Sequence, residues 1–268
     1  MENSIIALNL RRGGGLDNAG GLFHASELFP LHAFTLADVL ITLGIIGIVA
    51  AMTLPALQQK IQYKKYETGF KVAENLLHNA VNYFHSKEKM INGETYCTAN
   101  PGNEDSNFCN DGQYEVFSEV LAEAFIGIHA LNKNGIGGYA ANKYYNFKNN
   151  TKFAYGLLDD GYMELTNGMS VIIESGSNTT LPIIFFDVNG TANKPNRMGY
   201  DTFAFVIDKN DRVCPLGSSS CKGRSSYIET TSDFTKSKYC SPASSSDNNG
   251  ITCGYFASID KDYFKKIK

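Results

Sequence analysis

Hydrophobic positions are concentrated in one stretch near the start of the chain. From Val39 to Gln59, 21 consecutive residues carry no charge. A helix of that length covers about 31 Å, which matches the hydrocarbon core of a bilayer. The pattern therefore predicts a single passage through a membrane, with everything after residue 60 soluble.

The apolar pattern continues past Pro55 at helical spacing, with polar residues such as His78 and His85 largely on the other side. The apolar positions are Leu57, Ile61, Tyr66, Phe70, Ala73, Leu77, Val81 and Phe84. This stripe predicts one continuous helix from Thr35 to about Lys87, about 80 Å long. Pro55 predicts a kink or local melting inside it; a helix that simply ends at Pro55 is the alternative.

Three roles fit the apolar segment. The first is a secretory signal peptide cut after Ala51, where Val49-Ala50-Ala51 offers small residues. The second is an ordinary signal anchor, and the third is the front half of a long helix that the mature protein keeps. A signal peptide that is removed does not need the amphipathic continuation. The pattern therefore favours the retained long helix.

Short β-like runs dominate the rest of the chain, after an expected helix over Tyr114–Ile128. The runs are Phe153–Leu158, Tyr162–Thr166, Ser170–Glu174, Ile183–Val188 and Phe203–Asp208. Turn-prone connections such as Asn167-Gly168 join several of them. They predict an antiparallel meander packed on the C-terminal half of the long helix, an α+β fold. We expect a loop over Ser241–Gly254, and then a final strand or short helix over Tyr255–Lys268.

All six cysteines follow the apolar segment, and none forms a C-x-x-C motif. An even number in loops rich in glycine, serine and asparagine is typical of three disulfides in an oxidising compartment. Six cysteines allow fifteen pairings, and free buried thiols in a reducing compartment are the alternative. We expect the local set Cys97–Cys109, Cys214–Cys221 and Cys240–Cys253.

The charge of the chain bears on its partners and on the side of the membrane that the soluble region occupies. The net charge is −3 and the isoelectric point about 6.0, so no nucleic-acid partner is indicated. Lys60, Lys64 and Lys65 follow the apolar run, and by the positive-inside rule they would place the downstream region in the cytoplasm. The cysteines argue for the opposite side, and we give them more weight.

Candidate chemistry in the soluble region is sparse. Asp187, Asn189 and Asp201 put oxygen ligands and glycines in one loop, which is a candidate Ca²⁺ site; a metal-free network of turns is the alternative, since no bidentate glutamate follows. No other cofactor is expected. Motifs for nucleophilic, metallopeptidase or phosphate chemistry are lacking, and His129 is expected to be a solvated loop residue. We therefore expect no enzyme.

The boundary of the apolar run carries the sequence Thr35-Leu-Ala-Asp38. A carboxylate inside a membrane helix costs on the order of 2.5 to 3.5 kcal/mol at the centre and less near an end. A capping box between Thr35 and Asp38 is the structural explanation of this acid. It does not exclude a functional role.

These residues resemble the N-terminal motif of type IV pilins and type II secretion pseudopilins. That family has a small residue, an N-methylated phenylalanine, Thr-Leu, an acid at mature position five, an apolar run, and a proline at position twenty-two. Phe34, Asp38 and Pro55 fall in that register. Ala33 stands where the family has glycine, and Asp38 where it has glutamate. The match covers about residues 32 to 87 closely.

The resemblance implies a structural subunit with a pilin-like head. A prepilin peptidase would cut between Ala33 and Phe34 and methylate the new amine, and Asp38 would pair with the Phe34 ammonium of a neighbouring subunit. The implied parts are a leader (1–33), an assembly half of the helix (34–59), an amphipathic half (60–88) and the head (89–268).

The implied partners are other copies or related pilin subunits, the peptidase and methyltransferase, an inner-membrane assembly platform and membrane lipid. The implied place is the bacterial inner membrane, crossed once, with the head in the periplasm or another extracytoplasmic space, and then the filament. The alternative is a membrane-anchored or secreted binding module that uses the apolar segment only for export.

Overall fold

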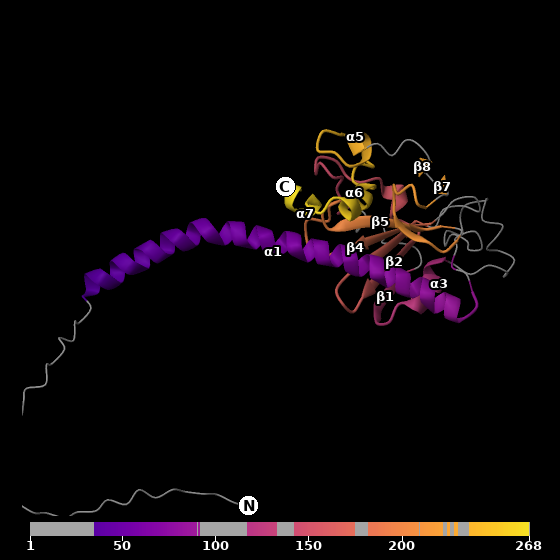
Figure 1. Ribbon diagram of the computed structural model, residues 1–268, viewed down its shortest axis with the longest axis horizontal. Coiled ribbons are helices and arrows are strands. Elements are labelled where there is room, and N and C mark those ends of the chain that lie inside the picture. Colours follow the sequence, from indigo (N-terminus) through magenta and orange to yellow (C-terminus); the bar gives the residue numbers. More distant parts are fainter. Residues whose placement is uncertain are drawn as a thin grey trace, which may run out of the picture. The chain divides into compact units, whose positions relative to one another are not determined.

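The computed structural model describes residues 35–89, 91, 117–132, 142–174, 182–208, 210–221, 224–225, 228–229 and 236–267. Contacts along the backbone divide the chain into two compact units, Met1–Met52 and Thr53–Lys268, which are treated separately below. The fold is α+β, with a long N-terminal apolar helix and an antiparallel sheet in the second unit (Figure 1).

Helix α1 runs from Leu36 to Ser86 and confirms the predicted helix to within a residue at each end. Pro55 lies inside it, so the alternative that the helix ends at Pro55 is wrong. The predicted kink stays a prediction. Loss of one backbone hydrogen bond at Pro55 is tolerated because the turns on both sides keep theirs.

Within the described residues, six strands form the main sheet, and they pair in chain order as an antiparallel meander. Strands β2, β3, β4 and β5 confirm four of the predicted runs, each to within one residue at either end. The bounds are β1 Ile128–Asn132, β2 Gly161–Leu165, β3 Ser170–Glu174, β4 Ile183–Asp187, β5 Thr202–Ile207 and β6 Val213–Pro215. A separate pair joins β7 Arg224–Ser225 to β8 Ile228–Glu229.

The strand predicted over Phe153–Leu158 is wrong. This segment contains the short 3-10 helix η2, Tyr155–Leu157. Phe153, Leu157 and Leu158 are all buried in one hydrophobic cluster. Side chains of a half-buried strand alternate between its faces, whereas these three positions bury their side chains together, which a tight turn permits.

The helix predicted over Tyr114–Ile128 is too long. Within the described residues, helix α3 covers Phe117–Ala124, and β1 has begun by Ile128. Gly127 adopts φ +79°, a left-handed conformation that a continuing helix does not allow. The backbone at this glycine therefore turns the chain from helix to strand.

For Tyr255–Lys268 the sequence predicts either a strand or a short helix, and the helical prediction is confirmed. Most of the loop expected over Ser241–Gly254 is present, between α5, Lys236–Tyr239, and α6, Cys253–Ile259. Helix α7, Tyr263–Lys266, follows. No strand is found over the described part of Tyr255–Lys268.

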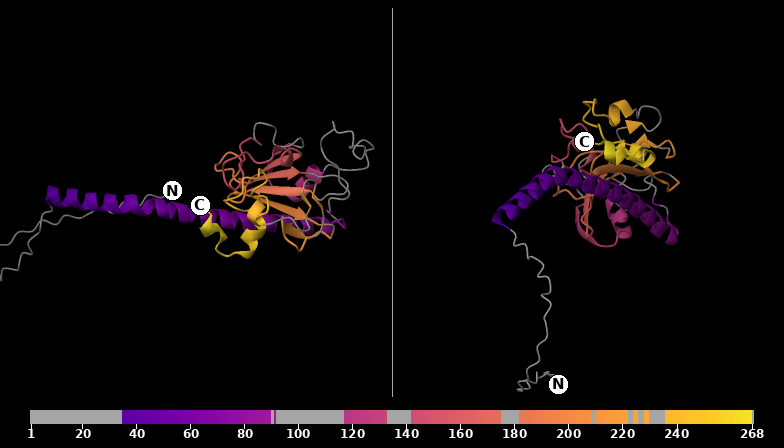
Figure 2. Two further views of the ribbon diagram at one scale, coloured as in Figure 1. Left: turned by 90° about the horizontal axis from the view of Figure 1, so that it is seen from above. Right: turned by 60° about the vertical axis from the view of Figure 1, so that its left-hand side comes forward.

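The sheet buries both of its faces. In β4, Ile184 and Phe186 enter the first core together with the buried stripe of α1, while Ile183 and Phe185 enter a second core. The second core is covered by the segment 144–158 and by residues of the loops near the C-terminus. The head therefore has three layers, with α1 and the segment 144–158 on opposite faces of the sheet (Figure 2).

The second half of α1 is held by a stripe at helical spacing. Its buried residues are Tyr66, Gly69, Phe70, Ala73, Leu77, Ala80, Val81 and Phe84. The ring of Phe70 lies 5.0 Å from that of Phe203 edge-to-face and 5.5 Å from that of Phe205 in a stacked arrangement. Such aromatic pairs add to the free energy that burial of their area already provides. Leu57 and Ile61, which the sequence pattern includes in the stripe, are exposed.

The end of α1 is tied to the turn between β5 and β6. Nε2 of His85 lies 2.7 Å from Oδ2 of Asp211, and the backbone N–H of Ile91 donates to both oxygens of that carboxylate. The sequence pattern placed His85 on the solvated face, but the fold gives it this partner. The carboxylate of Asp211 is completely buried, so these donors compensate its loss of hydration.

Two of the expected disulfides are present. Cys214 is bonded to Cys221 and Cys240 to Cys253, with Cα–Cα distances of 5.9 and 5.0 Å. The expected pair Cys97–Cys109 lies outside the described residues. Both bonds close short loops: Cys214 and Cys221 belong to the second core, and Cys240 and Cys253 to the first.

Gly69 provides a test of the contact between helix and sheet. A Cβ atom at this position would lie 2.6 Å from the Cβ of Val188. Overpacking of this kind costs about 1 to 3 kcal/mol, while alanine gains about 1 kcal/mol of helix propensity. We predict that Gly69→Ala lowers the free energy of unfolding by up to about 2 kcal/mol, measured by urea denaturation in detergent.

Gly156→Ala is the control, because a Cβ at Gly156 meets nothing within 4 Å. Equal stability of the Gly69→Ala variant and the unmodified chain would show that α1 and the sheet pack less closely than described.

Candidate functional site

The start of helix α1 forms a reciprocal capping box. The backbone N–H and the hydroxyl of Thr35 both donate to Oδ2 of Asp38, at 3.0 and 2.7 Å. In return, the backbone N–H of Asp38 donates to Oγ1 of Thr35 at 3.2 Å. The structural explanation of the acid is thus confirmed: Thr35 is the N-cap, and it fixes the carboxylate at the helix end.

The capping box occupies one oxygen of Asp38. Within the part of the chain that the structure describes, Oδ1 accepts no hydrogen bond, and the residue is exposed. A cap therefore accounts for half of the hydrogen-bonding capacity of this carboxylate. The expected cleavage and methylation residues, Ala33 and Phe34, lie outside the described residues, so the pair with Phe34 stays a prediction.

The helix that follows Asp38 presents apolar side chains on all sides. It is long and apolar enough to cross a membrane, with a mean hydropathy of 2.3, and its most apolar window has no buried residue. The exposed large residues include Leu40, Ile41, Ile45 and Ile48. Apolar exposure on this scale marks a surface that contacts lipid or other protein. This is consistent with a single-pass membrane protein.

Two glycines interrupt this apolar surface. A Cβ atom added at Gly44 or Gly47 would meet nothing within 4 Å. No contact in the described chain therefore explains their small size. Glycines three residues apart lie near one another on the helix surface, where they permit the close approach of a second helix.

The structure brings together two of the three predicted calcium ligands. Asp187 ends β4, and Asp201 immediately precedes β5, where the N–H of Val188 bonds to the carbonyl of Asp201 at 2.8 Å. Both carboxylates belong to fully buried residues. Buried carboxylates this close repel one another, and burial disfavours the charge of each.

Both carboxylates accept three hydrogen bonds each within the described chain. Asp187 accepts from the N–H groups of Asn189 and Gly190, at 3.2 and 3.0 Å, and from the hydroxyl of Tyr144 at 2.7 Å. For Asp201 the donors are the N–H groups of Asn196 and Arg197, at 2.9 and 2.7 Å, and the hydroxyl of Thr202 at 3.3 Å. These contacts favour the metal-free network of turns.

The third predicted ligand, Asn189, is used differently. Its amide Nδ2 donates to the carbonyls of Asn193 and Lys194, at 3.2 and 3.1 Å. Its buried Oδ1 has no partner in the described chain. The amide therefore holds the loop between β4 and β5, and its oxygen is the one ligand group that the hydrogen bonds leave open.

Protonation of the pair is coupled to folding. Burial and the neighbouring charge raise the pKa of Asp187 to about 8, and burial raises the pKa of Asp201 to about 6, from an ordinary value of 3.8. Burial and the charge of Asp187 also raise the pKa of Tyr144, which keeps this hydroxyl protonated as a donor.

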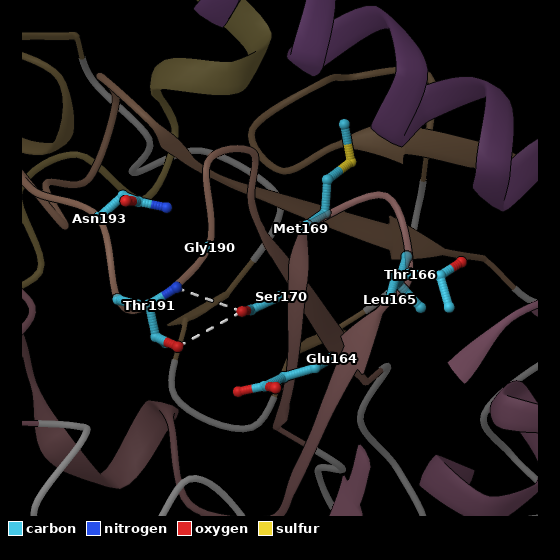
Figure 3. Close-up of a pocket in the computed structure, with 10 residues that line it drawn as sticks. Glu164, Leu165, Thr166, Met169, Ser170, Gly190, Thr191 and Asn193 are labelled. Atoms are coloured by element: carbon cyan, nitrogen blue, oxygen red, sulfur yellow. Dashed lines mark hydrogen bonds between the residues drawn. The ribbon is translucent and has the colours of Figure 1, made fainter. Parts of the chain in front are cut away.

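A hydroxyl cluster lies beside this loop. Glu164, Ser170 and Thr191 line a cavity of about 220 Å³ between the β2–β3 turn and the loop after β4 (Figure 3). The N–H of Thr191 donates to Oγ of Ser170 at 3.2 Å, and the hydroxyl of Tyr162 donates to Glu164 at 2.6 Å. These hydrogen bonds connect the loop after β4 to the sheet. No histidine takes part in them, so they include no base that would activate a serine.

Three acidic side chains that were not among the predicted site residues lie close together. Oxygens of Asp159, Asp160 and Glu174 lie within 4.8 Å of one another. The three residues come from two segments, the turn before β2 and the end of β3. No local pattern predicts this group, because strand pairing brings its members together.

Comparisons of the chain with protein-family models, with curated proteins and with solved structures returned no match.

The paired carboxylates predict a pH-dependent stability. A folded-state pKa above the unfolded value means that the contribution to stability is complete below about pH 4 and is lost as the pH rises through 6 and 8. We predict that the melting temperature in a chelator falls between pH 5 and pH 8, and that Asp187→Asn reduces this fall. Asp247→Asn, at an exposed position, is the control. A fall of equal size in the Asp187→Asn variant would contradict the assignment to this pair.

The same measurement tests the calcium site. If Ca²⁺ bound at Asp187, Asn189 and Asp201, chelation at pH 8 would lower the melting temperature, because a ligand that binds the folded state stabilises it. The hydrogen-bond network predicts no such shift. A shift that Asp187→Asn abolishes and Asp159→Asn preserves would establish calcium at the predicted loop.

Proposed function

We propose that the chain is a prepilin-like structural subunit, which is cleaved before Phe34, methylated there, and assembled into a type IV pilus or a type II secretion pseudopilus. In this proposal the first half of α1 anchors the subunit in the inner membrane and then becomes part of the filament core. The head stays on the extracytoplasmic side.

The observation that carries the proposal is Asp38 at the end of an apolar helix. Thr35 satisfies one oxygen of this carboxylate, and Oδ1 accepts nothing from the described chain. A carboxylate at the edge of a bilayer is costly without a counter-charge. The ammonium group that cleavage creates at Phe34 of a neighbouring copy supplies both that charge and a hydrogen-bond donor.

The unburied surface of α1 supports the same reading. The large apolar side chains of α1 from Leu36 to Ile61 are exposed, and the most apolar part of the helix is apolar enough to lie in lipid. Since lipid and helix neighbours satisfy such a surface about equally well, packing and polar pairs decide between them. Gly44 and Gly47 offer close packing, and Asp38 offers the polar pair.

The two disulfides support the extracytoplasmic side for the head. Such bonds persist in oxidising compartments and are rare in the cytoplasm. Under this proposal the partners are other copies or related subunits, the prepilin peptidase and methyltransferase, and an assembly platform in the inner membrane. The competing proposal, an anchored or exported binding module, assigns no role to Oδ1 of Asp38.

Substitutions of Asp38 separate its two roles. Asp38→Asn keeps an oxygen that accepts from Thr35 but removes the charge, and Asp38→Ala removes both. We predict that both variants insert into the membrane at the normal level, yet enter sheared filaments about ten-fold less, as an ion pair worth about 1.4 kcal/mol requires. Immunoblots of membrane and filament fractions measure this.

Asp38→Glu is the matched control. It keeps the charge, lengthens the side chain by one methylene, and should restore incorporation to within a few-fold of the unmodified chain. If the asparagine variant enters filaments normally, capping alone explains Asp38, and the proposed ion pair is wrong.

A further inference from the structure

A second cavity lies in the head. It has a volume of about 670 Å³ and lies between the segment 142–152 and the loop 191–196. The same segment sends Tyr144 and Phe153 into the second core and Phe147 into the first. One wall of the cavity is therefore anchored by side chains that are buried in both cores.

The lining of the cavity is basic. Three of its ten lining residues are lysines, Lys143, Lys152 and Lys194, and none of the ten is acidic. The ammonium of Lys152 lies 3.7 Å from the centre of the Tyr145 ring. A chain with a net charge of −3 thus concentrates positive charge at one concave site.

The positive charge of the lining affects the pKa of Tyr145. A hydrogen bond and the charge of Lys152, together with the charge of Lys194, lower the pKa of its hydroxyl below the ordinary value. Tyr145 is half-buried and lines the cavity, so these positive charges lie at the cavity wall. An anionic group placed there meets at least two ammonium groups.

The remaining lining residues favour a ligand that also carries hydroxyl groups. Asn142, Asn149 and Asn196 each offer an amide, which donates and accepts hydrogen bonds at once. Asn196 is held by its Nδ2, which donates to the carbonyl of Thr191 at 2.9 Å, and its buried Oδ1 has no partner in the described chain.

Nucleic acid fits this lining less well. Binding of single strands uses free aromatic faces on which successive bases stack. The cavity lining contains one aromatic ring, that of Tyr145, and Lys152 covers a face of it. Simple inorganic anions carry no array of hydroxyl donors. Sugar acids combine both kinds of group.

We propose that this cavity binds an acidic oligosaccharide, such as a chain of uronic acids, with its carboxylates on the three lysines and its hydroxyls on the asparagines. The proposal rests on the proposed function in one respect only: that function places the head on the extracytoplasmic side, where such a ligand reaches the cavity. Binding itself does not depend on assembly.

Calorimetry with the purified full chain in detergent tests the proposal. The probe is trigalacturonate, at low and high salt, and the neutral trisaccharide maltotriose is the comparison. We expect saturable binding of trigalacturonate that weakens with salt. The double variant Lys152→Gln with Lys194→Gln should weaken it by about ten-fold or more, because two charge-assisted contacts are lost. Lys261→Gln, at an exposed lysine outside the cavity, should leave binding unchanged.

Several outcomes would overturn the proposal: no saturable binding of trigalacturonate, equal binding of maltotriose, equal loss in the Lys261→Gln variant, or tighter binding of a single-stranded DNA oligonucleotide at the same lysines. Citrate tests for attraction of charge alone, and equal affinity for citrate would also overturn it. Circular dichroism of each variant verifies folding. Failure of any of these tests leaves filament incorporation unaffected, so it is distinguishable from failure of the proposed function.

Discussion

The packing of the α1 stripe against the sheet is the interaction on which the rest of the structure depends. It begins near Tyr66 and ends near Phe84, and Gly69 lets the helix approach Val188 closely. The buried residues of α1 all belong to this stripe, and the large apolar side chains before it, from Leu36 to Ile61, are exposed. The chain thus buries one half of a helix in its own core and leaves the other half to its surroundings.

That division constrains the polar groups at the far end of the helix. Asp38 is the only charged residue between Thr35 and Gln59. Its capping box with Thr35 stabilises the helix start, but it leaves Oδ1 without a donor in the described chain. In water this oxygen would be hydrated, whereas at the boundary of a bilayer it needs a partner. Assembly with a neighbouring copy is the event that the proposed function assigns to that need.

Periodicity predicted the parts of the fold that local sequence determines. Helix α1 and strands β2 to β5 follow from apolar spacing, and the two observed disulfides join cysteines that are near in sequence. The segment 153–158 was misassigned because its apolar residues pack together in a turn. The short edge strand β6, Val213–Pro215, carries almost no pattern. Contacts between distant residues, such as that of His85 with Asp211, have no local signal at all.

The candidate sites divide in the same way. The motif at Thr35 and Asp38 is contiguous, so the sequence predicted its geometry. The proximity of Asp187 and Asp201 was expected from one loop, but the hydrogen bonds that their carboxylates accept from the backbone depend on how that loop folds. The lysine-lined cavity combines residues about 40 positions apart in the sequence. Only the fold brings the segment 142–152 beside the loop 191–196.

The central claim is that the mature chain begins at Phe34 and keeps the apolar helix. Intact-mass and fragmentation analysis of the chain isolated from membranes tests it most directly. The account predicts an N-methylated phenylalanine, Phe34, as the first residue. A chain that starts at Met52, or that retains its first 33 residues in the mature form, would contradict it.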